Sequence, residues 1–247
     1  MSFQLIKSHQ QTPGAFDNNR ILERKPVAFP QEGWPLKSFS TLFYWAHAWS
    51  DEGGLIAEHP HRGFEICSFI VKGTIEHYDS KQQKWIKLSA GDAQIIRSGT
   101  GITHAERLNP GGAIFQIWFD PDLQQSMQKP ATYDDYPAAV FPVETNNGVA
   151  TKTIIGAGSP FELDTPVQVR QVDLEAGEQS INLTNGYTAG AFLLEGQVSV
   201  GELQLETGDF ILAQGETEIH TDVQSSARIF IVEVQDQAPY ATYAAGM

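Results

Sequence analysis

The sequence predicts an all-β protein made of two tandem barrels of the same kind. Three observations support this fold class. Short runs of β-branched and aromatic residues recur between residues 66 and 119, with turn residues about every 8–12 positions, a spacing typical of β-sandwiches and barrels. The second half of the chain repeats two segments of the first. Only one short stretch, residues 121–128, looks helical.

The N-terminal region predicts short edge strands and loops. Residues 1–38 mix polar and apolar positions and are interrupted by proline and glycine, which disfavours long helices. A strand is predicted over residues 39–49, because aromatic side chains favour strands. Alternation along this strand places Phe43, Trp45 and His47 on one face.

Five further strands are predicted to complete a first barrel, which we assign to residues 1–125. Glycine and other turn residues separate them, since tight turns between strands often need a positive φ. The predicted strands span residues 66–71, 74–78, 84–88, 93–97 and 113–119.

A linker is predicted between the two barrels. Prolines 121, 130, 137 and 142 interrupt the stretch between residues 120 and 151. We therefore assign residues 126–150 to a connection between domains.

A weakened repeat predicts the second barrel, residues 151–247. Residues 69–75 align with residues 192–198, and residues 91–96 align with residues 208–213. Counting back from the aligned positions places Asn182 and Thr184 where the first repeat has two histidines. Neither is a good ligand for a transition metal. His220 falls near the position of His104 but has no partners, so we expect the second barrel to be structural and to lack a metal.

Composition limits the classes of partner. The chain has 247 residues and a formal net charge of −14, which argues against binding nucleic acid or an anionic membrane surface through net charge. No run approaches the ~20 apolar residues that a membrane span needs.

The N-terminal residues do not resemble a signal peptide. The single cysteine, Cys67, fits a reducing compartment. We expect a cytoplasmic protein.

The most informative stretch contains two histidines, His59 and His61. Side chains at positions i and i+2 of a strand point to the same side, so the two imidazoles can aim at one point. The same spacing recurs in His104 and Glu106. Two such strands facing each other in a barrel would give a site of three nitrogens and one oxygen, which suits a divalent first-row metal. A His-x-His pattern alone is weak evidence; the second ligand-type pair strengthens the prediction.

At these residues the chain resembles the pirin family of the cupin superfamily. The resemblance is concentrated between about residues 50 and 120. It rests on residues 59–65, 73–80, 91–94 and 99–106, which follow the order and spacing of that family. It implies two cupin (jelly-roll) barrels, a bicupin.

The resemblance also implies a metal site and an activity. Pirins hold one metal with three histidines and a glutamate, a role that would fall on His59, His61, His104 and Glu106. Glu65 is the alternative fourth ligand, because many other cupins use that position. Iron is the expected metal, with manganese, nickel, cobalt, copper and zinc as alternatives.

Some pirins oxidise flavonols such as quercetin with dioxygen, which implies an aromatic substrate here. Glu106 would be the catalytic base. Phe43, Trp45 and Phe115 would flank a flat substrate or, equally well, belong to the core. The alternative function is a metal- or redox-dependent regulatory protein that binds a transcription factor or a metabolic enzyme.

Overall fold

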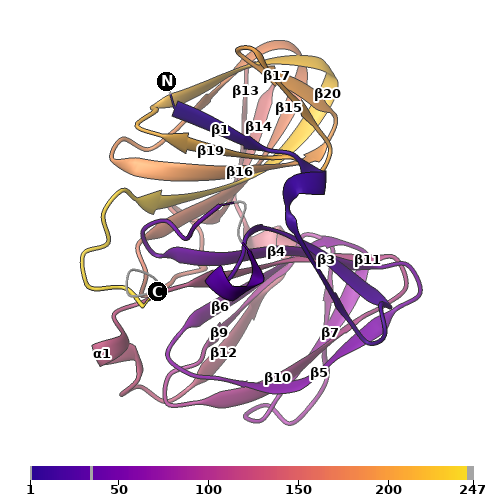
Figure 1. The fold of residues 1–247 in the computed structure, drawn as a ribbon, viewed down its shortest axis with the longest axis vertical. Coiled ribbons are helices and arrows are strands. Elements are labelled where there is room, and N and C mark those ends of the chain that lie inside the picture. The colour runs from indigo at the N-terminus through magenta and orange to yellow at the C-terminus, as the bar shows by residue number, and fades with distance from the viewer. Residues whose placement is uncertain (1, 34–35, 244–247) are drawn as a thin grey trace. The chain divides into compact units, whose positions relative to one another are not determined.

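The computed structural model describes residues 2–33 and 36–243, and strands dominate in them (Figure 1). The chain divides into two compact units. The first unit contains residues 12–138 and 238–243, and the second unit contains residues 2–11 and 139–237. Each is a jelly-roll β-barrel, in agreement with the fold class that the sequence predicts.

Two sheets form the first unit within the described residues. The larger sheet has the order β12 (Thr132–Tyr136), β9 (Ala93–Arg97), β6 (Glu65–Lys72), β11 (Gly112–Phe119), β4 (Leu42–Ser50), β3 (Ile21–Val27) and β2 (Thr12–Phe16). The smaller sheet has the order β5 (Gly54–His61), β10 (Ile102–Leu108), β7 (Thr74–Asp79) and β8 (Ile86–Ser89). The smaller sheet carries the predicted metal ligands.

The second unit is built around two long strands, β15 (Val167–Asn182) and β20 (Glu218–Gln235). The other strands, in chain order, are β1 (Ser2–Ile6), β13 (Val143–Asn146), β14 (Val149–Ile155), β16 (Tyr187–Glu195), β17 (Gln197–Val200), β18 (Leu203–Glu206) and β19 (Phe210–Gln214). The main path is β1-β19-β16-β20-β15-β14-β13, and β17 joins it through β20. Helices in the described residues are short: η1 (Ser8–Gln10), η2 (Pro30–Glu32), α1 (Leu123–Ser126) and η3 (Ala138–Val140).

The ends of the chain do not follow the expected domain boundaries. Strand β1, which we expected in the first barrel, pairs antiparallel with β19 of the second unit (Figure 1). Its partly buried Phe3 and Leu5 pack on the aliphatic core of the second unit, and this contact explains its position. Residues 238–243 belong instead to the first unit, where the ring of Tyr243 contacts Phe43 and Phe64.

The segment expected to be a linker, residues 126–150, also differs from expectation. It contains β12, which pairs with β9 and so extends the larger sheet of the first unit. It also contains β13, which forms a hairpin with β14 in the second unit. Side-chain contacts hold β12 in place, among them the ion pair of Arg97 with Asp134 at 2.6 Å.

The predicted repeat appears in the structure as a repeated turn. Gly73 and Gly196 both have positive φ, at 66° and 97°, in the one-residue connections between β6 and β7 and between β16 and β17. A Cβ atom on either glycine would lie within 3.0 Å of a backbone oxygen, so both positions require glycine. The side chains of Asp92 and Asp209 each accept a hydrogen bond from the backbone N–H three residues earlier.

Aliphatic side chains fill both barrels. In the first unit, a cluster around Ile75, Leu108 and Ile114 packs the smaller sheet against the larger one. No helix among the described residues is long and apolar enough to cross a membrane.

Candidate metal centre

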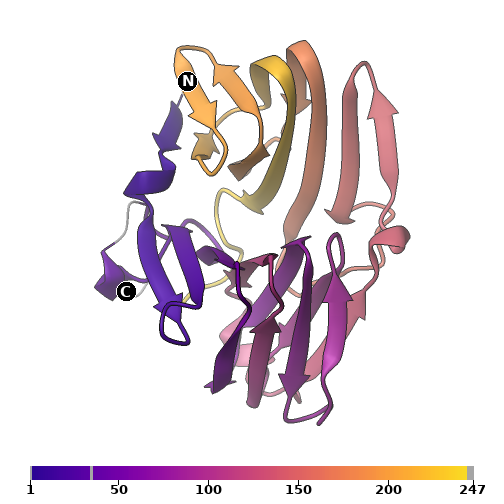
Figure 2. The same ribbon diagram turned by 90° about the vertical axis from the view of Figure 1, so that its right-hand side faces the viewer.

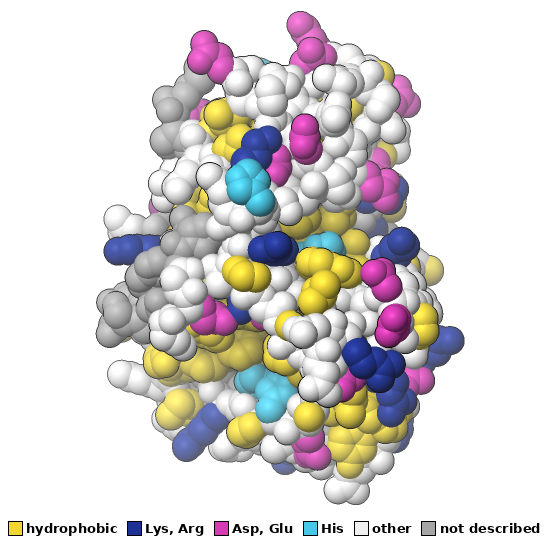
Figure 3. All heavy atoms as spheres, turned by 45° about the vertical axis from the view of Figure 1, so that its right-hand side comes forward, with side chains coloured by type: hydrophobic (Ala, Val, Ile, Leu, Met, Phe, Trp, Pro, Cys, Tyr) yellow, Lys and Arg dark blue, Asp and Glu magenta, His cyan; other side chains and the backbone are white. Residues whose placement is uncertain are grey.

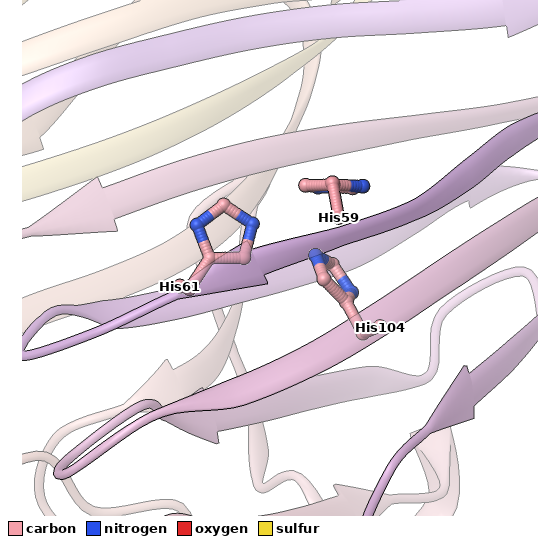
Figure 4. Close-up of side chains that lie close together, drawn as sticks. All are labelled: His59, His61 and His104. Carbon is pink, nitrogen blue, oxygen red and sulfur yellow. The ribbon is translucent and has the colours of Figure 1, made fainter.

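Three histidines from two neighbouring strands converge on one point. Strands β5 and β10 pair antiparallel, with His104 opposite His59 and Ile102 opposite His61. The ring centroids of His59, His61 and His104 lie 4.5–4.9 Å apart. Figure 4 shows the three rings facing one another across the two strands. The i, i+2 spacing thus places both histidines of β5 on the side where His104 points.

The nitrogen atoms of these rings suit a metal ion. One ligand nitrogen from each ring lies within 4.8 Å of the other two. His59 Nδ1 lies 2.7 Å from the carbonyl oxygen of Ala57, so a proton on Nδ1 leaves Nε2 with a free lone pair. His61 Nε2 and both nitrogens of His104 are buried and have no hydrogen-bond partner among the described residues. Buried polar atoms normally have partners, so these atoms fit a bound cation.

Burial keeps two of the rings neutral at physiological pH. It lowers the pKa of His61 to about 4, with a smaller contribution from His59. It also holds the pKa of His104 well below its ordinary value, and the neighbouring histidines lower it further. A neutral imidazole offers a lone pair to a metal, so neither ring must lose a proton before it can bind one.

Glu106 lies in the same strand as His104 and is completely buried. Ser68 Oγ and Gln94 Nε2 donate to its Oε1 at 2.9 and 3.0 Å, and Gln116 Nε2 donates to its Oε2 at 2.6 Å. These three bonds fix the carboxylate. One carboxylate oxygen of Glu106 lies within 4.8 Å of a ring nitrogen of His104 and of a ring nitrogen of His77. These three residues form a second set of metal-ligand type in the described residues.

His77 of β7 also belongs to this buried group. It lies opposite Glu106 in the register of β7 and β10. Its Nε2 is 2.8 Å from Asp79 Oδ2, whose partner oxygen accepts two backbone N–H groups. The ring of His77 stacks on Tyr133 of β12 at 4.4 Å. One sequence signal does point to His77 and Asp79, because they also have the i, i+2 spacing.

Glu65, the alternative fourth ligand, lies in a different environment. Its carboxylate is buried and Arg97 Nε lies 4.0 Å away. Among the described residues it belongs to neither set of metal-ligand type. The structure thus places Glu106, and not Glu65, beside His104.

The aromatic residue beside the histidines is Trp118, which sequence analysis did not identify. Its ring lies edge-on to His61 at 4.7 Å, and its Nε1 donates to Gln116 Oε1. Phe43, Trp45 and Phe115 are 2%, 0% and 0% exposed, so they belong to the core and are not available to flank a substrate. Figure 3 shows histidine side chains beside hydrophobic ones on one face of the molecule.

The second unit has different residues at the matching positions. His104 follows Gly91 by thirteen residues, and Thr221 follows Gly208 by the same interval. Thr221 is paired with Gln179, as His104 is with His59. His220, whose sequence position is one residue earlier, therefore points to the opposite side of its strand, and its side chain is 79% exposed. The sequence alignment places Asn182 at the position of His59, but the residue that pairs with Thr221 is Gln179, three residues earlier, and Asn182 pairs with Glu218.

Part of the chain is similar to proteins of a known family. A family model described as Pirin matches residues 32–119. Pirin-1 of Arabidopsis thaliana is 32% identical over 58% of this chain and 51% of its own length. Quercetin 2,3-dioxygenase of Escherichia coli (strain K12) is 41% identical over 26% of this chain and 29% of its own length. The chain spans only about half the length of Pirin-1 and 44% of pirin-like protein 2 from Arabidopsis thaliana.

Solved structures share the fold over nearly the whole chain. The bacterial pirin YhhW from Escherichia coli, in complex with nickel(II), has a TM-score of 0.78 and 19% identity, covering 95% of this chain and 99% of its own. Quercetin 2,3-dioxygenase from Acinetobacter baumannii has a TM-score of 0.73 and 23% identity, covering 87% and 81%. At these identities the likeness shows the fold alone.

Proposed function

Because residues 32–119 match the Pirin family model and relatives named as pirins and quercetin 2,3-dioxygenases align with the chain, we propose that it is a pirin of the cupin superfamily and a metal-dependent dioxygenase of the quercetin 2,3-dioxygenase type. The observation that carries the proposal is the convergence of His59, His61 and His104. The buried nitrogens of His61 and His104 that have no hydrogen-bond partner among the described residues fit a metal ion. The printed names of relatives support a flavonol-like aromatic substrate and dioxygen.

In this proposal four side chains hold one metal ion. His59, His61 and His104 contribute one ring nitrogen each, and Glu106 contributes a carboxylate oxygen. Iron is our first choice, and manganese, nickel, cobalt, copper and zinc are the alternatives. When bound, such an ion supplies Lewis acidity toward a substrate oxygen and, for iron, a redox couple. The second barrel holds no metal in this proposal, because Thr221 and Gln179 replace His104 and His59.

The protein's own groups would bind the substrate and accept its proton. Glu106 accepts the proton of a flavonol hydroxyl in this proposal, because it is the carboxylate beside His104. The hydrogen bonds from Ser68, Gln94 and Gln116 hold its oxygens in place during that transfer. The half-buried ring of Trp118 offers a flat surface beside His61 for an aromatic substrate.

Metal content tests the site. We expect about one metal ion per chain in protein purified without chelators, and almost none in His59→Ala or His104→Ala. His220→Ala is the matched control, because His220 is exposed in the second unit, and it should retain the metal. Equal metal content in wild type and His104→Ala would contradict the ligand assignment. Two ions per chain would contradict the metal-free second barrel.

Oxygen consumption tests the activity. Iron-loaded protein should consume dioxygen when quercetin is added, and His104→Ala should lose this activity. The control reaction omits the flavonol. If fully iron-loaded protein consumes no dioxygen with a panel of flavonols, the proposed enzymatic activity is wrong. The metal site is tested separately, by the metal content.

A cytoplasmic location is part of this proposal. The lone cysteine, Cys67, is buried and forms no disulfide, as suits a reducing compartment. Cell fractionation with periplasmic and cytoplasmic markers tests it, and recovery outside the cytoplasm would contradict it.

A further inference from the structure

The second unit contains a cleft whose lining residues include none of the candidate metal centre. Its volume is about 1250 Å³, and residues of β13, β14, β15, β17, β18 and β20 line it. Pockets for small molecules typically measure ~300–1,000 Å³, so the cleft can hold a ligand of several fused or linked rings. Figure 2 shows the hairpin of β13 and β14 beside the long, curved β15.

Six polar residues that are half-buried or buried line the cleft, beside the buried aliphatic residues Ile155, Val169 and Ile181. We call these six the polar floor: Thr151, Thr153, Gln168, Arg170, Gln179 and Thr221. Thr153 lies directly opposite Arg170 in the register of β14 and β15. Hydroxyl groups, carboxamides and a guanidinium therefore meet at the bottom of one cleft.

This polar floor adjoins an aliphatic core. Val172 and Leu174 continue the alternation of Gln168 and Arg170 along β15, yet they belong to the hydrophobic cluster of the second unit. Five of the six floor residues are only half-buried, so the cleft leaves their side chains accessible. Ligand binding would explain polar side chains at positions that continue the alternation of core residues.

The position of the cleft supports this explanation. Gln179 and Thr221 of the floor form the strand pair that matches His59 and His104 of the first unit. The second barrel thus has groups suited to hydrogen bonding where the first has groups suited to metal ligation.

Several groups in the lining are free to bind a ligand. Among the described residues, the side chains of Asn146, Gln168 and Asn182 make no hydrogen bond. Arg170 Nε is buried and also has no partner there, although its Nη2 lies 3.0 Å from Glu233 Oε2. A carboxamide offers a donor and an acceptor side by side, which matches two neighbouring hydroxyl groups.

The charge of the lining selects against anions. Four carboxylates, those of Glu144, Glu178, Glu218 and Asp222, face one guanidinium, so the formal charge is −3 with His220 neutral. Glu233 already neutralises that guanidinium. An anionic ligand would meet net repulsion.

From these observations we propose that the second barrel binds a neutral, polyhydroxylated molecule of the saccharide class in this cleft. Gln168, Asn182 and the floor threonines hydrogen-bond its hydroxyl groups, and Arg170 Nε–H donates to one of its oxygens. The site needs no metal and is independent of the chemistry at the first barrel.

Calorimetric titration of the full chain with three linear trisaccharides tests the proposal. Maltotriose is neutral, triglucosamine is cationic and trigalacturonate is anionic, while all three carry neighbouring hydroxyl groups. We expect maltotriose to bind with a Kd of ~1 mM or lower and trigalacturonate to bind at least ~10-fold more weakly. No maltotriose binding, or binding of triglucosamine alone, overturns the proposal.

Two substitutions locate the binding. Gln168→Leu and Thr153→Val remove polar groups of the floor while nearly keeping their size, and each should weaken maltotriose binding by ~3–10-fold. Gln197→Leu is the matched control, since Gln197 is an exposed residue of β17 outside the lining, and it should bind as wild type does. Unchanged affinity in both floor variants, with circular dichroism showing them folded, overturns the site.

Metal removal separates this site from the proposed enzyme. Chelator-treated protein and His104→Ala should bind maltotriose with unchanged affinity. Loss of binding in both would place the saccharide at the first barrel and overturn the inference, whatever the outcome of the oxygen-consumption test.

Discussion

At the scale of single residues, Gln116 connects the parts of the candidate metal centre. Its Nε2 donates to Glu106 Oε2 at 2.6 Å, and its Oε1 accepts from Trp118 Nε1 at 3.2 Å. Trp118 in turn contacts the ring of His61. One carboxamide therefore orients both a proposed ligand and the aromatic ring beside another.

Replacing Gln116 with leucine should weaken metal binding without abolishing it. Partners that orient metal ligands typically contribute ~10–100-fold in affinity, so we expect a decrease of that size in Gln116→Leu. Competition with a chromophoric chelator measures it. Gln82→Leu is the control, because Gln82 is exposed and uses only its backbone N–H. Wild-type affinity in Gln116→Leu would show that Glu106 needs no such support.

The thiol of Cys67 should be unreactive in the native protein. It is completely buried, and burial raises the pKa of its thiol well above the ordinary value. Little of the reactive thiolate forms at pH 8 as a result. We expect no reaction with Ellman's reagent over an hour, and one thiol per chain after addition of guanidinium chloride. Rapid labelling of native protein would show that β6 opens readily.

The sequence predicts that His59 and His61 point to the same side, because the i, i+2 rule depends only on the strand conformation, and the resemblance to pirins adds His104. It does not predict the contact of His77 with Glu106. That contact depends on which strand pairs with β10 on its second side and in what register. The identity of the four ligands stays a prediction.

At the scale of secondary-structure elements, strand β3 brings a charged group into the interior. Lys25 is 3% exposed, and its Nζ lies 2.9 Å from Glu23 Oε1 and contacts Glu32. Tyr44 Oη also donates to Glu23, at 3.3 Å. Glu23 is itself buried, so its charge depends on these partners.

Substituting Lys25 with methionine should destabilise the first unit. Removing one partner of a buried ion pair typically costs ~3–5 kcal/mol, because the other charge stays buried without compensation. Urea denaturation of Lys25→Met at pH 7 measures this. Lys87→Met, at an exposed position of β8, should change the unfolding free energy by less than ~0.5 kcal/mol. Equal effects of the two substitutions would contradict the role of the ion pair.

The same ion pair predicts a pH dependence. Burial lowers the pKa of Lys25, but hydrogen bonds and attraction from Glu32 and Glu23 outweigh it, so the pKa lies above the ordinary 10.5. A raised folded-state pKa stabilises the fold below pH 10.5, and this stabilisation is lost as the pH rises through the folded value. The difference in unfolding free energy between wild type and Lys25→Met should therefore shrink above that pH.

Strand positions were largely predictable, because apolar alternation marks buried strands. β9 occupies the predicted residues 93–97, β7 and β11 differ from prediction by one residue at one end, and β6 differs by one residue at each end. β12 was not predictable in this way. None of its residues 132–136 is a buried apolar residue, so the strand has no apolar alternation. It is held instead by the stacking of Tyr133 on His77 and by the ion pair of Asp134 with Arg97.

At the scale of the whole molecule, neither compact unit is one continuous piece of chain. Residues 2–11 complete the second unit, where Lys7 Nζ and the backbone N–H of Ser8 bind the carboxylate of Asp209 at 2.9 and 2.8 Å. A boundary drawn near residue 125 or 150 misses this exchange, since the short segment 2–6 has no sequence feature that names its partner.

Deleting residues 1–11 should therefore weaken the second unit more than the first. The deletion exposes the edge of β19 and removes Phe3 and Leu5 from the core cluster. Hydrogen exchange followed by mass spectrometry should show faster exchange in β19 and β16, with β6 and β10 unchanged. Deleting residues 241–247, of which the described residues 241–243 lie outside the second unit, is the control. Equal protection of β19 in the two deletions would contradict this prediction.

The pairing of β1 with β19 also has a consequence for synthesis on the ribosome. Residues 2–6 leave the ribosome well before their partners, residues 210–214. At translation rates of ~5–20 residues per second, the first strand waits about 10–40 s for its partner to be made. The first barrel can close during that interval, while the leading strand stays unpaired and accessible to chaperones. Strand β1 is thus translated long before it can fold.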